Sequence, residues 1–306
     1  ADILRIGAYQ ILFLDRVPDN AAVHTSVELA KVSGRGQAAG LVNAVLRRMC
    51  REKKALPAIP DRDEARYLSI RYSHPKWLVK RLLSLLGRAG AEEFLSVSNS
   101  QPPVAAQVNT CRYTADDAAA MLLGEGVSSE RHPWLTDCLV LKETGNLERL
   151  RAFQNGMIYI QDPAARLAVL AAGLQPGSRV LDVCAAPGGK SFAAAIAMKG
   201  RGEIISCDIY ENKLKRIREG AARLDLPSIH AETADGRILR EEWRNRFDAV
   251  LVDVPCSGLG ILRKKPDIRR KRADSLFTLP VVQNAILENA ALYVRPGGTL
   301  LYSTCT

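Results

Sequence analysis

The sequence predicts an α/β protein whose C-terminal half forms a doubly wound parallel sheet, preceded by an all-helical region and a small α+β module. Two observations lead to this prediction. After residue 163, short apolar runs alternate with amphipathic segments, as in parallel strands joined by helices. Before residue 90, apolar residues instead recur every three or four positions, which is the helical period. We therefore expect three successive regions along the chain.

The first region, residues 1–56, is expected to be all-helical. Its clearest helix runs from Gln37 to Cys50, where a single apolar stripe is formed by Ala38, Leu41, Val42, Val45, Leu46 and Met49. A second apolar helix is expected from Ile3 to Leu14. The segment from Leu56 to Pro60 contains two prolines, which cannot continue a helix, so we predict a linker there.

The second region, residues 61–160, is expected to begin with helix up to Gly90 and to continue as the small α+β module. The module should contain three short strands and two helices: strands Val104–Asn109, Leu135–Leu141 and Met157–Ile160, and helices Thr114–Gly124 and Asn146–Phe153. Thr114 is a suitable cap for the first of these helices. Asp162, followed by Pro163, is a suitable cap for the helix that enters the next region.

The third region, residues 161–306, is expected to be a Rossmann-like doubly wound sheet. Five apolar runs are predicted to be its parallel strands: Arg179–Val183, Glu203–Cys207, Ser228–Thr233, Ala249–Val252 and Thr299–Ser303. Amphipathic segments between most of them predict the covering helices. Ligands of such open sheets bind beyond the carboxyl ends of the strands, so the functional residues should lie there.

Composition excludes several classes of protein. The 306 residues contain no apolar run of about 18 residues, so no membrane span is predicted. We also predict no signal peptide, because the chain begins with an amphipathic helix pattern. The seven cysteines are scattered and form no CxxC pair, which argues against a disulfide framework or a zinc site and favours the cytoplasm. The four histidines form no ligand cluster, so we expect no metal.

The net charge of +10 is unevenly distributed. Residues 1–90 carry 16 Lys and Arg against 8 Asp and Glu, whereas the rest of the chain carries 27 against 25. A basic N-terminal third on a nearly neutral body indicates docking to a polyanion. The alternative is a basic surface that serves solubility, but the asymmetry favours nucleic acid.

A turn rich in small residues follows the first predicted strand of the sheet, from Asp182 to Lys190. It lets a ligand approach the backbone closely, and the following helix start can bind a carboxylate. Asp208 and Asp235 follow the next two strands, where they are placed to meet ribose hydroxyls and an adenine amino group. Each aspartate could instead be a cap, but three at successive strand ends favour an adenosyl cofactor. The residues expected to bind it are Cys184, Ala185, Ala186, Pro187, Gly188, Gly189, Lys190, Asp208, Asp235 and Asp253.

The turn differs from two other nucleotide-binding motifs. It does not match GxGxxG, which weakens a dinucleotide interpretation. The segment Gly188-Gly189-Lys190-Ser191 resembles the end of a P-loop, but Ala185 stands where that motif needs its first glycine.

Two cysteines close the fourth and fifth predicted strands, at the same edge as this turn. Cys256 lies in Asp253-Val254-Pro255-Cys256-Ser257-Gly258, and Cys305 lies in Ser303-Thr304-Cys305-Thr306. A lone cysteine is usually a small buried apolar residue, but these two have polar, turn-forming flanks. Two thiols beside an alkyl donor indicate covalent catalysis on an electrophilic ring, for which a pyrimidine is the natural candidate.

Together with the Asp182–Lys190 turn, these two motifs resemble the Sun/Fmu family of RNA cytosine carbon-5 methyltransferases. The helix containing Leu41-Val42-Asn43-Ala44-Val45-Leu46-Arg47-Arg48 resembles the NusB-like domain of members that act on small-subunit ribosomal RNA. The resemblance covers nearly the whole chain, with Val254 and Thr306 as mild departures. It implies S-adenosyl-L-methionine as cofactor, ribosomal RNA as substrate, a cytoplasmic location and a monomer. It also implies that the N-terminal and C-terminal domains are both truncated here.

The resemblance implies unequal roles for the site residues. Cys305 would add to carbon 6 of cytosine, and Cys256 would assist removal of the carbon-5 proton and release of the adduct. Asp253 would hydrogen-bond the ring nitrogen and amino edge of the base. The reverse assignment stays open, because in DNA cytosine-5 methyltransferases the nucleophile follows a proline, as Cys256 does here.

A basic segment, residues 263–272, follows Cys256 and is expected to contact the RNA backbone. The contacts should come from Arg263, Lys264, Lys265, Arg269 and Arg270. By contrast, Trp77, Trp134 and Trp243 are expected in the core or at interfaces rather than as stacking platforms. Two other functions remain open: the same chemistry on transfer RNA, or a non-catalytic RNA-binding assembly factor.

Overall fold

A computed structural model describes residues 1–53, 58–271 and 273–305. The chain divides into two compact units, Ala1–Ser73 and His74–Thr306. The predicted linker from Leu56 to Pro60 lies inside the first unit by this division, and Leu56 and Pro57 are outside the described residues. Among the helices that the structure describes, none is both long and apolar enough to cross a membrane.

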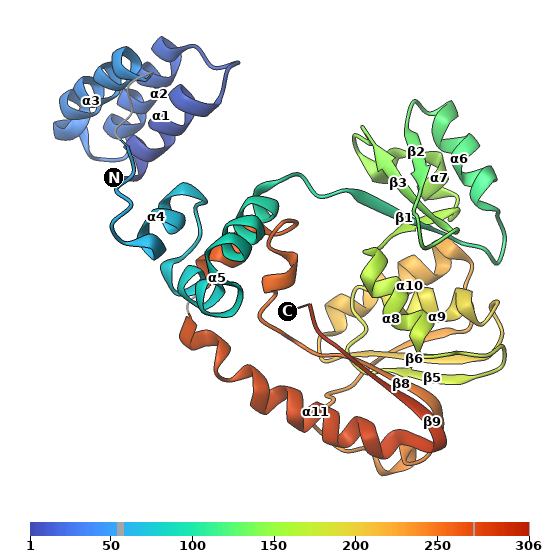
Figure 1. The fold of residues 1–306 in the computed structure, drawn as a ribbon. Helices are drawn as coiled ribbons and strands as arrows, with labels where there is room; N and C mark the ends of the chain where they lie inside the picture. The colour runs from blue at the N-terminus through green and yellow to red at the C-terminus, as the bar shows by residue number, and fades with distance from the viewer. Residues whose placement is uncertain (54–57, 272, 306) are drawn as a thin grey trace. The chain divides into compact units, whose positions relative to one another are not determined.

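The first unit is helical, as predicted (Figure 1). It consists of α1 (Asp2–Phe13), α2 (Asp19–Val32), the 3-10 helix η1 (Gly36–Ala38), α3 (Ala39–Glu52) and α4 (Glu64–Arg71). The first three α-helices enclose one core, to which α3 contributes Val42 and Leu46. The predicted stripe on α3 is only partly buried, since Leu41 is 62% exposed.

The second unit opens with α5 (Lys76–Asn99), in which Gly87 has non-helical backbone angles, φ 67° and ψ −177°. Positive φ at this position suits glycine, and it divides α5 into two arms. The region up to Gly90 is helical, as predicted, and α5 continues past Gly90 to Asn99. The second arm buries Ala91 and Leu95 and leads into the small module.

The small α+β module is an antiparallel sheet in the order β2-β3-β1-β4. Its elements are β1 (Val104–Val108), α6 (Ala115–Gly124), β2 (Ser128–Arg131), β3 (Cys138–Lys142), η2 (Leu147–Arg149), α7 (Arg151–Gln154) and β4 (Ile158–Ile160). Thr114 caps α6 as predicted, in a capping box with Asp117. The sequence did not indicate β2, because this edge strand is polar and mostly exposed.

The large sheet is parallel throughout, in the order β7-β6-β5-β8-β9, and confirms the predicted doubly wound fold. Its strands are β5 (Arg179–Asp182), β6 (Glu203–Asp208), β7 (Ile229–Thr233), β8 (Phe247–Asp253) and β9 (Val294–Ser303). The sequence placed the start of β9 at Thr299, five residues late. The first part of the strand contains Pro296, Gly297 and Gly298, which are unfavourable in strands.

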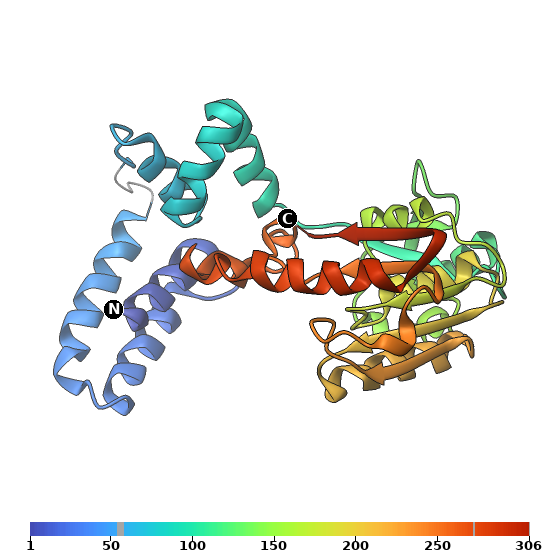
Figure 2. The same ribbon diagram turned by 90° about the horizontal axis from the view of Figure 1, so that it is seen from below.

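Helices cover both faces of this sheet. On one face, α8 (Pro163–Ala171), α9 (Gly189–Ala197) and α10 (Glu211–Leu224) build a core with the strands (Figure 1). On the other, α11 (Leu279–Tyr293) packs on β8 and β9 (Figure 2). Asp162 caps α8 through the Ala164 N–H, with Pro163 in its first turn, as predicted.

The module is fixed to the sheet domain by close backbone contacts. Asn109 Nδ2 donates to the carbonyl of Leu224 in α10, at 2.7 Å, and to that of Gly156, at 3.2 Å. Gly156 has φ 69°, and a Cβ there would lie 2.0 Å from the Arg223 carbonyl oxygen. Only glycine permits this approach. The module can therefore present Ile160 and Gln161 to the sheet edge in a fixed position.

Candidate active site

The carboxyl edge of the large sheet collects the chemistry-bearing residues. The parallel register places Asp182 beside Ser206 on β6 and beside Leu251 on β8, and places Asp253 beside Ser303 on β9. Cys256 and Cys305 follow the last two of these strands. Residues predicted from scattered motifs are thus brought to one edge.

The predicted cofactor turn joins β5 to α9. Gly188 is the N-cap of α9 and has φ 108°, and a Cβ there would lie 2.5 Å from the Phe192 ring. The turn borders a pocket of about 190 Å³ that also reaches the end of the module and β8. Its lining includes Ile160, Gln161, Asp182, Cys184, Ala185, Ala186, Pro187, Gly189, Lys190 and Asp253.

Asp182 is fully buried at the base of this pocket. Its Oδ2 accepts a hydrogen bond from Ser191 Oγ at 2.7 Å, and Ser206 Oγ lies 2.8 Å from Ser191 Oγ. Its Oδ1 has no partner of normal hydrogen-bond geometry, although the nearby Cys184 N–H favours the charged form. Burial dominates and raises the pKa of Asp182 to about 6. The free carboxylate oxygen makes this site suitable for a cationic group such as an ammonium.

We expect Asp182→Asn to remove a pH dependence of stability between about pH 4 and pH 6. Burial raises the pKa from 3.8 to about 6, so the folded state holds this proton more tightly than the unfolded chain. Its contribution is present below pH 3.8 and lost as the pH rises through about 6. The free energy of unfolding, measured with denaturant at both ends of this range, should include a contribution of up to about 3 kcal/mol that the unmodified protein loses as the pH rises. Asp182→Asn should not show this loss.

The matched control is Asp267→Asn, which changes an exposed aspartate in a short 3-10 helix, Pro266–Arg270. This variant should keep the pH dependence of the unmodified protein. If the loss of stability between pH 4 and 6 persisted in Asp182→Asn, it would have to come from other groups.

The other two predicted cofactor aspartates differ in their surroundings. Asp208 Oδ1 accepts from the Tyr210 N–H at 3.0 Å and lies 3.5 Å from Lys213 Nζ. Asp235 binds the Arg237 guanidinium through both oxygens, and this lowers its pKa. To reach an adenine amino group, Asp235 would have to share its oxygens with Arg237.

Two apolar side chains near these aspartates were not singled out by the sequence. Ile209 and Ile238 line a pocket of about 320 Å³ that also includes Asp235, and both are exposed. Exposed branched side chains flanking a pocket can hold a flat ring between them. They follow β6 and β7, and this position at two strand ends is the signal that could have identified them.

The two cysteines meet at the ends of β8 and β9. Their sulfur atoms lie 2.8 Å apart, and both are partly buried thiols that form no disulfide. The Gly260 N–H donates to the Cys305 carbonyl at 2.7 Å, and Gln283 Nε2 donates to the Pro255 carbonyl at 2.9 Å. Burial first, then the Cys256 thiol and the charge of Asp253, raise the pKa of Cys305 to about 11. Thr306, which ends the second motif, is outside the described residues.

Asp253 and Lys190 join the cofactor turn to the cysteine strands. Lys190 Nζ lies 2.7 Å from Asp253 Oδ2, and Ser303 Oγ donates to Asp253 Oδ1 at 3.0 Å. Both members of the ion pair line the pocket next to Asp182. One carboxylate is therefore in contact with Lys190 of the predicted cofactor turn and with Ser303, the last residue of β9, two positions before Cys305.

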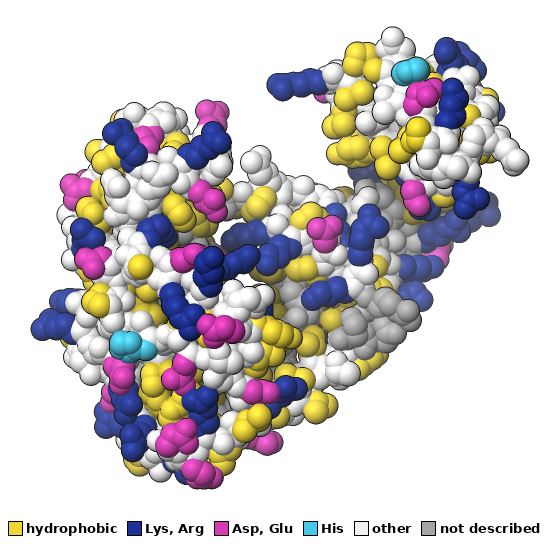
Figure 3. All heavy atoms as spheres, turned by 180° about the vertical axis from the view of Figure 1, so that it is seen from behind, with side chains coloured by type: hydrophobic (Ala, Val, Ile, Leu, Met, Phe, Trp, Pro, Cys, Tyr) yellow, Lys and Arg dark blue, Asp and Glu magenta, His cyan; other side chains and the backbone are white. Residues whose placement is uncertain are grey.

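The predicted RNA-binding residues separate into two groups. Arg263 donates to the carbonyls of Ser100 and Gln101, Arg269 to that of Ser98, and Lys264 pairs with Asp162. The side chains of Lys265 and Arg270 are exposed and make no hydrogen bond or ion pair within the described part of the chain. Arg272, in the same segment, is outside that part. Figure 3 shows Lys and Arg side chains gathered over the middle of one face.

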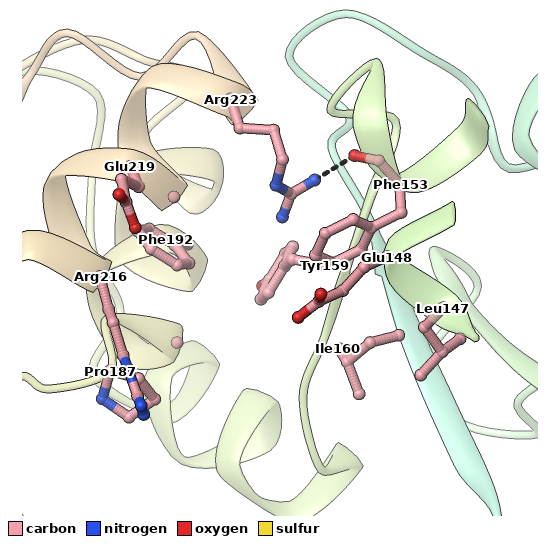
Figure 4. Close-up of a pocket in the computed structure, with 12 residues that line it drawn as sticks. Leu147, Glu148, Phe153, Tyr159, Ile160, Pro187, Phe192, Arg216, Glu219 and Arg223 are labelled. Carbon is pink, nitrogen blue, oxygen red and sulfur yellow. Dashed lines mark hydrogen bonds between the residues drawn. The ribbon is translucent and has the colours of Figure 1, made fainter. Parts of the chain in front are cut away.

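A larger pocket of about 740 Å³ lies between the module and helices α9 and α10 (Figure 4). In Figure 4, Arg223 extends from α10 toward Phe153 of the module. Its guanidinium donates to the Phe153 carbonyl and to that of Ile158, the latter at 2.9 Å, and lies 3.7 Å from the Phe153 ring centre. Burial lowers the pKa of Arg223 to about 10. Arg223 thus serves as a structural link between the two parts.

The doubly wound sheet, the glycine turn after β5 and the aspartates at successive strand ends define an S-adenosylmethionine-dependent methyltransferase. The site fits this cofactor for two reasons. The buried Asp182 Oδ1 has no hydrogen-bond partner among the residues described and suits the cofactor's ammonium group. Gly188, which has no Cβ, lets a ligand approach the backbone of the turn. In the described residues, no group of three or more His, Cys, Asp or Glu side chains is arranged to hold a metal ion.

Comparison with known proteins identifies the family. Residues 169–306 match the model for the 16S rRNA methyltransferase RsmB/F. Residues 1–51 match the NusB family, and residues 74–148 match the ferredoxin-like domain of RsmF/B-like methyltransferases. The chain belongs to the RsmB/F methyltransferase family, which confirms the predicted resemblance.

This chain is similar in sequence to curated relatives over nearly its full length. It is 39% identical to the probable ribosomal RNA small subunit methyltransferase B of Bacillus subtilis, covering 99% of this chain and 68% of the relative. It is 34% identical to ribosomal RNA small subunit methyltransferase B of Vibrio cholerae, covering 99% and 69%.

Solved structures share the fold. A methyltransferase homologue from Pyrococcus horikoshii, 28% identical, superposes with a TM-score of 0.69, covering 79% of this chain and 77% of that one. A further crystal structure, 27% identical, reaches a TM-score of 0.86 over 99% of this chain and 68% of that one.

Proposed function

We propose that this protein methylates carbon 5 of a cytosine in small-subunit ribosomal RNA, through a covalent adduct with Cys305. The observation that carries the proposal is the pair of thiols, 2.8 Å apart, at the strand ends beside the cofactor turn. A protein that only bound RNA would need neither thiol. The curated relatives named as ribosomal RNA small subunit methyltransferases support this RNA as the substrate.

The thiol pair suits a reaction at cytosine carbon 5, which is a weak nucleophile by itself. Addition of the Cys305 thiolate to carbon 6 makes carbon 5 enamine-like and able to accept a methyl group. S-adenosylmethionine supplies that methyl group as an electrophile when bound. We expect Asp182, Gly188 and Asp208 to hold the cofactor, from the pocket lining, from the turn after β5 and from the end of β6.

Asp253 and Cys256 complete the proposed chemistry. Asp253 is held by Lys190 and Ser303, so its position is fixed before the base arrives. It accepts a hydrogen bond from the amino edge of the base and stabilises charge during the addition. Cys256 then takes the proton from carbon 5, and the bond between Cys305 and carbon 6 breaks to release the product.

All residues of the proposed site come from a single chain, so we expect the protein to act as a monomer. We place the reaction in the cytoplasm, where ribosomal RNA is found.

The test is methyl transfer from a labelled cofactor to candidate RNAs, followed by digestion to nucleosides. Label in 5-methylcytidine from small-subunit ribosomal RNA would support the proposal. Label in the same nucleoside from transfer RNA alone would support the proposed chemistry but show that transfer RNA is the substrate. RNA binding with no incorporated label, although the cofactor binds, would favour the non-catalytic assembly factor.

The RNA contacts give a separate prediction. Neutralising Lys265 and Arg270 together should weaken RNA binding and reduce the slope of log K against log salt by about two. Both side chains are exposed and without protein partners in the described ranges, so the thermal midpoint should not change. Binding can be followed by fluorescence anisotropy across a salt series.

Arg201→Ala/Lys215→Ala is the matched control, because it also removes two exposed positive charges, outside the basic segment. It should leave the salt slope nearly unchanged. An unchanged slope for Lys265→Ala/Arg270→Ala would exclude these two side chains as phosphate contacts. Arg269→Ala should instead lower stability, since Arg269 is partly buried and holds the Ser98 carbonyl.

A further inference from the structure

We propose that a groove beside Cys305 binds the RNA nucleotide next to the target cytosine, with its base stacked on Trp134. This inference rests on the proposed function, because it assigns a second subsite on the same RNA substrate. The groove has a volume of about 380 Å³, within the range of small-ligand pockets.

Trp134 is 77% exposed, which corrects the expectation that it lies in the core or at an interface. Trp77 and Trp243 are both partly buried, as expected. An exposed tryptophan ring loses a large apolar area from water when a flat group stacks on it. Base stacking on aromatic side chains is the usual means of binding single-stranded RNA.

His132 is in contact with Trp134 at the backbone and at the ring. The Trp134 backbone N–H donates to His132 Nδ1 at 3.3 Å, and the two rings meet edge to face with centroids 5.8 Å apart. Pro102 and Pro103, which precede β1, and Pro163 at the start of α8 line the same groove. Because these residues are stiff, the groove is formed before a ligand arrives.

The charge of the groove suits a phosphate. Arg263 and Lys264 line it, from the segment that follows Cys256. Arg263 is hydrogen-bonded to two neutral carbonyls, so its positive charge is not compensated by them. The ion pair of Lys264 with Asp162 is solvent-exposed, which makes it weak enough for a phosphate to share the ammonium group.

The groove is next to the proposed nucleophile. Gly260 lines it, and the Gly260 N–H donates to the Cys305 carbonyl at 2.7 Å. A nucleotide in the groove would therefore be a near neighbour of a base at the thiols. Enzymes that act on an extruded base commonly take their sequence preference from such flanking contacts.

A proline-rich peptide is the other ligand that an aromatic groove could take. The two cations and the proximity of Cys305 favour the nucleotide. The test therefore includes a proline-rich peptide as a competitor.

The experiment measures binding of a short, fluorescein-labelled, single-stranded oligoribonucleotide with one cytosine to the full chain. RNA should quench the tryptophan fluorescence of the unmodified protein, and Trp134→Phe should lose this quenching while binding within about twofold. Trp134→Ala should bind about tenfold more weakly, as expected for the loss of one stacked base. Leu123→Ala, which removes an exposed apolar side chain of α6 outside the groove, should bind like the unmodified protein.

Quenching that persisted in Trp134→Phe, or unchanged affinity in Trp134→Ala, would overturn the subsite, as would displacement of the RNA by the proline-rich peptide. These outcomes are separable from failure of the proposed function. Formation of 5-methylcytidine by a protein whose Trp134→Ala variant binds normally would reject the subsite alone. Quenching at Trp134 without any 5-methylcytidine would reject the chemistry and keep the subsite.

Discussion

Cys305→Ala is expected to abolish methyl transfer while RNA and cofactor still bind. Without the thiolate, carbon 5 of cytosine is not activated, and turnover should fall by roughly 10⁴-fold or more, the scale for deleting a covalent nucleophile. The change removes one small, partly buried side chain at a strand end, so the fold should be retained. Incorporation of labelled methyl groups, measured beside cofactor binding, tests this prediction.

The pH dependence of kcat/KM in the unmodified protein provides a second test of the role of Cys305. The pKa of Cys305 is raised to about 11, mainly by burial, so the thiol is protonated in the free protein at neutral pH. The reactive form is the thiolate, so kcat/KM should rise with pH across the neutral range.

Cys111→Ala is the matched control for Cys305→Ala, because it removes an exposed cysteine of the module outside the pocket. It should retain full activity and the same pH profile. If Cys305→Ala instead accumulated a covalent complex with RNA, Cys256 would be the attacking residue.

The sheet and the cofactor turn were predictable because local sequence determines them. The buried strands β5, β6 and β8 are apolar runs, and Gly188 is the residue type that its positive φ requires. Parallel strands then bring Asp182, Asp208 and Asp253 to one edge without further information. Topology alone therefore accounts for the predicted assembly of acidic residues.

Contacts between distant segments were not predictable in the same way. Arg263 and Arg269 follow the cysteine motif in sequence, and the sequence suggested contacts with phosphate. The structure uses them to hold carbonyls at the end of α5, more than 160 residues earlier in the chain. The sequence also gave no signal for the exposure of Trp134, which depends on how the turn before β3 meets α8 and the basic segment.

The distance between the two thiols is the most informative of these long-range contacts. The motifs predicted that Cys256 and Cys305 would share an edge, since they end neighbouring strands. They did not determine that the sulfur atoms would lie 2.8 Å apart. At that distance, either thiol could take the proton and either could attack the base. Variants of each cysteine are therefore needed to assign the two roles.

Cys256→Ala is expected to trap a covalent complex between the protein and its RNA. Cys305 can still attack carbon 6 and the methyl group can still be transferred, but no thiol remains beside it to take the carbon-5 proton. Loss of this acid–base step should slow turnover by about 10²- to 10⁴-fold. The complex should survive denaturing electrophoresis and carry one labelled methyl group per protein.

The double variant Cys256→Ala/Cys305→Ala decides whether Cys305 forms the trapped bond. It should give no complex, because neither thiol remains to attack carbon 6. A complex that formed in the double variant would require a third nucleophile and would refute the proposed mechanism. A complex in Cys305→Ala but not in Cys256→Ala would keep covalent catalysis and exchange the two roles. The two sulfur atoms lie only 2.8 Å apart, so their unequal roles would then follow from how each faces the bound base.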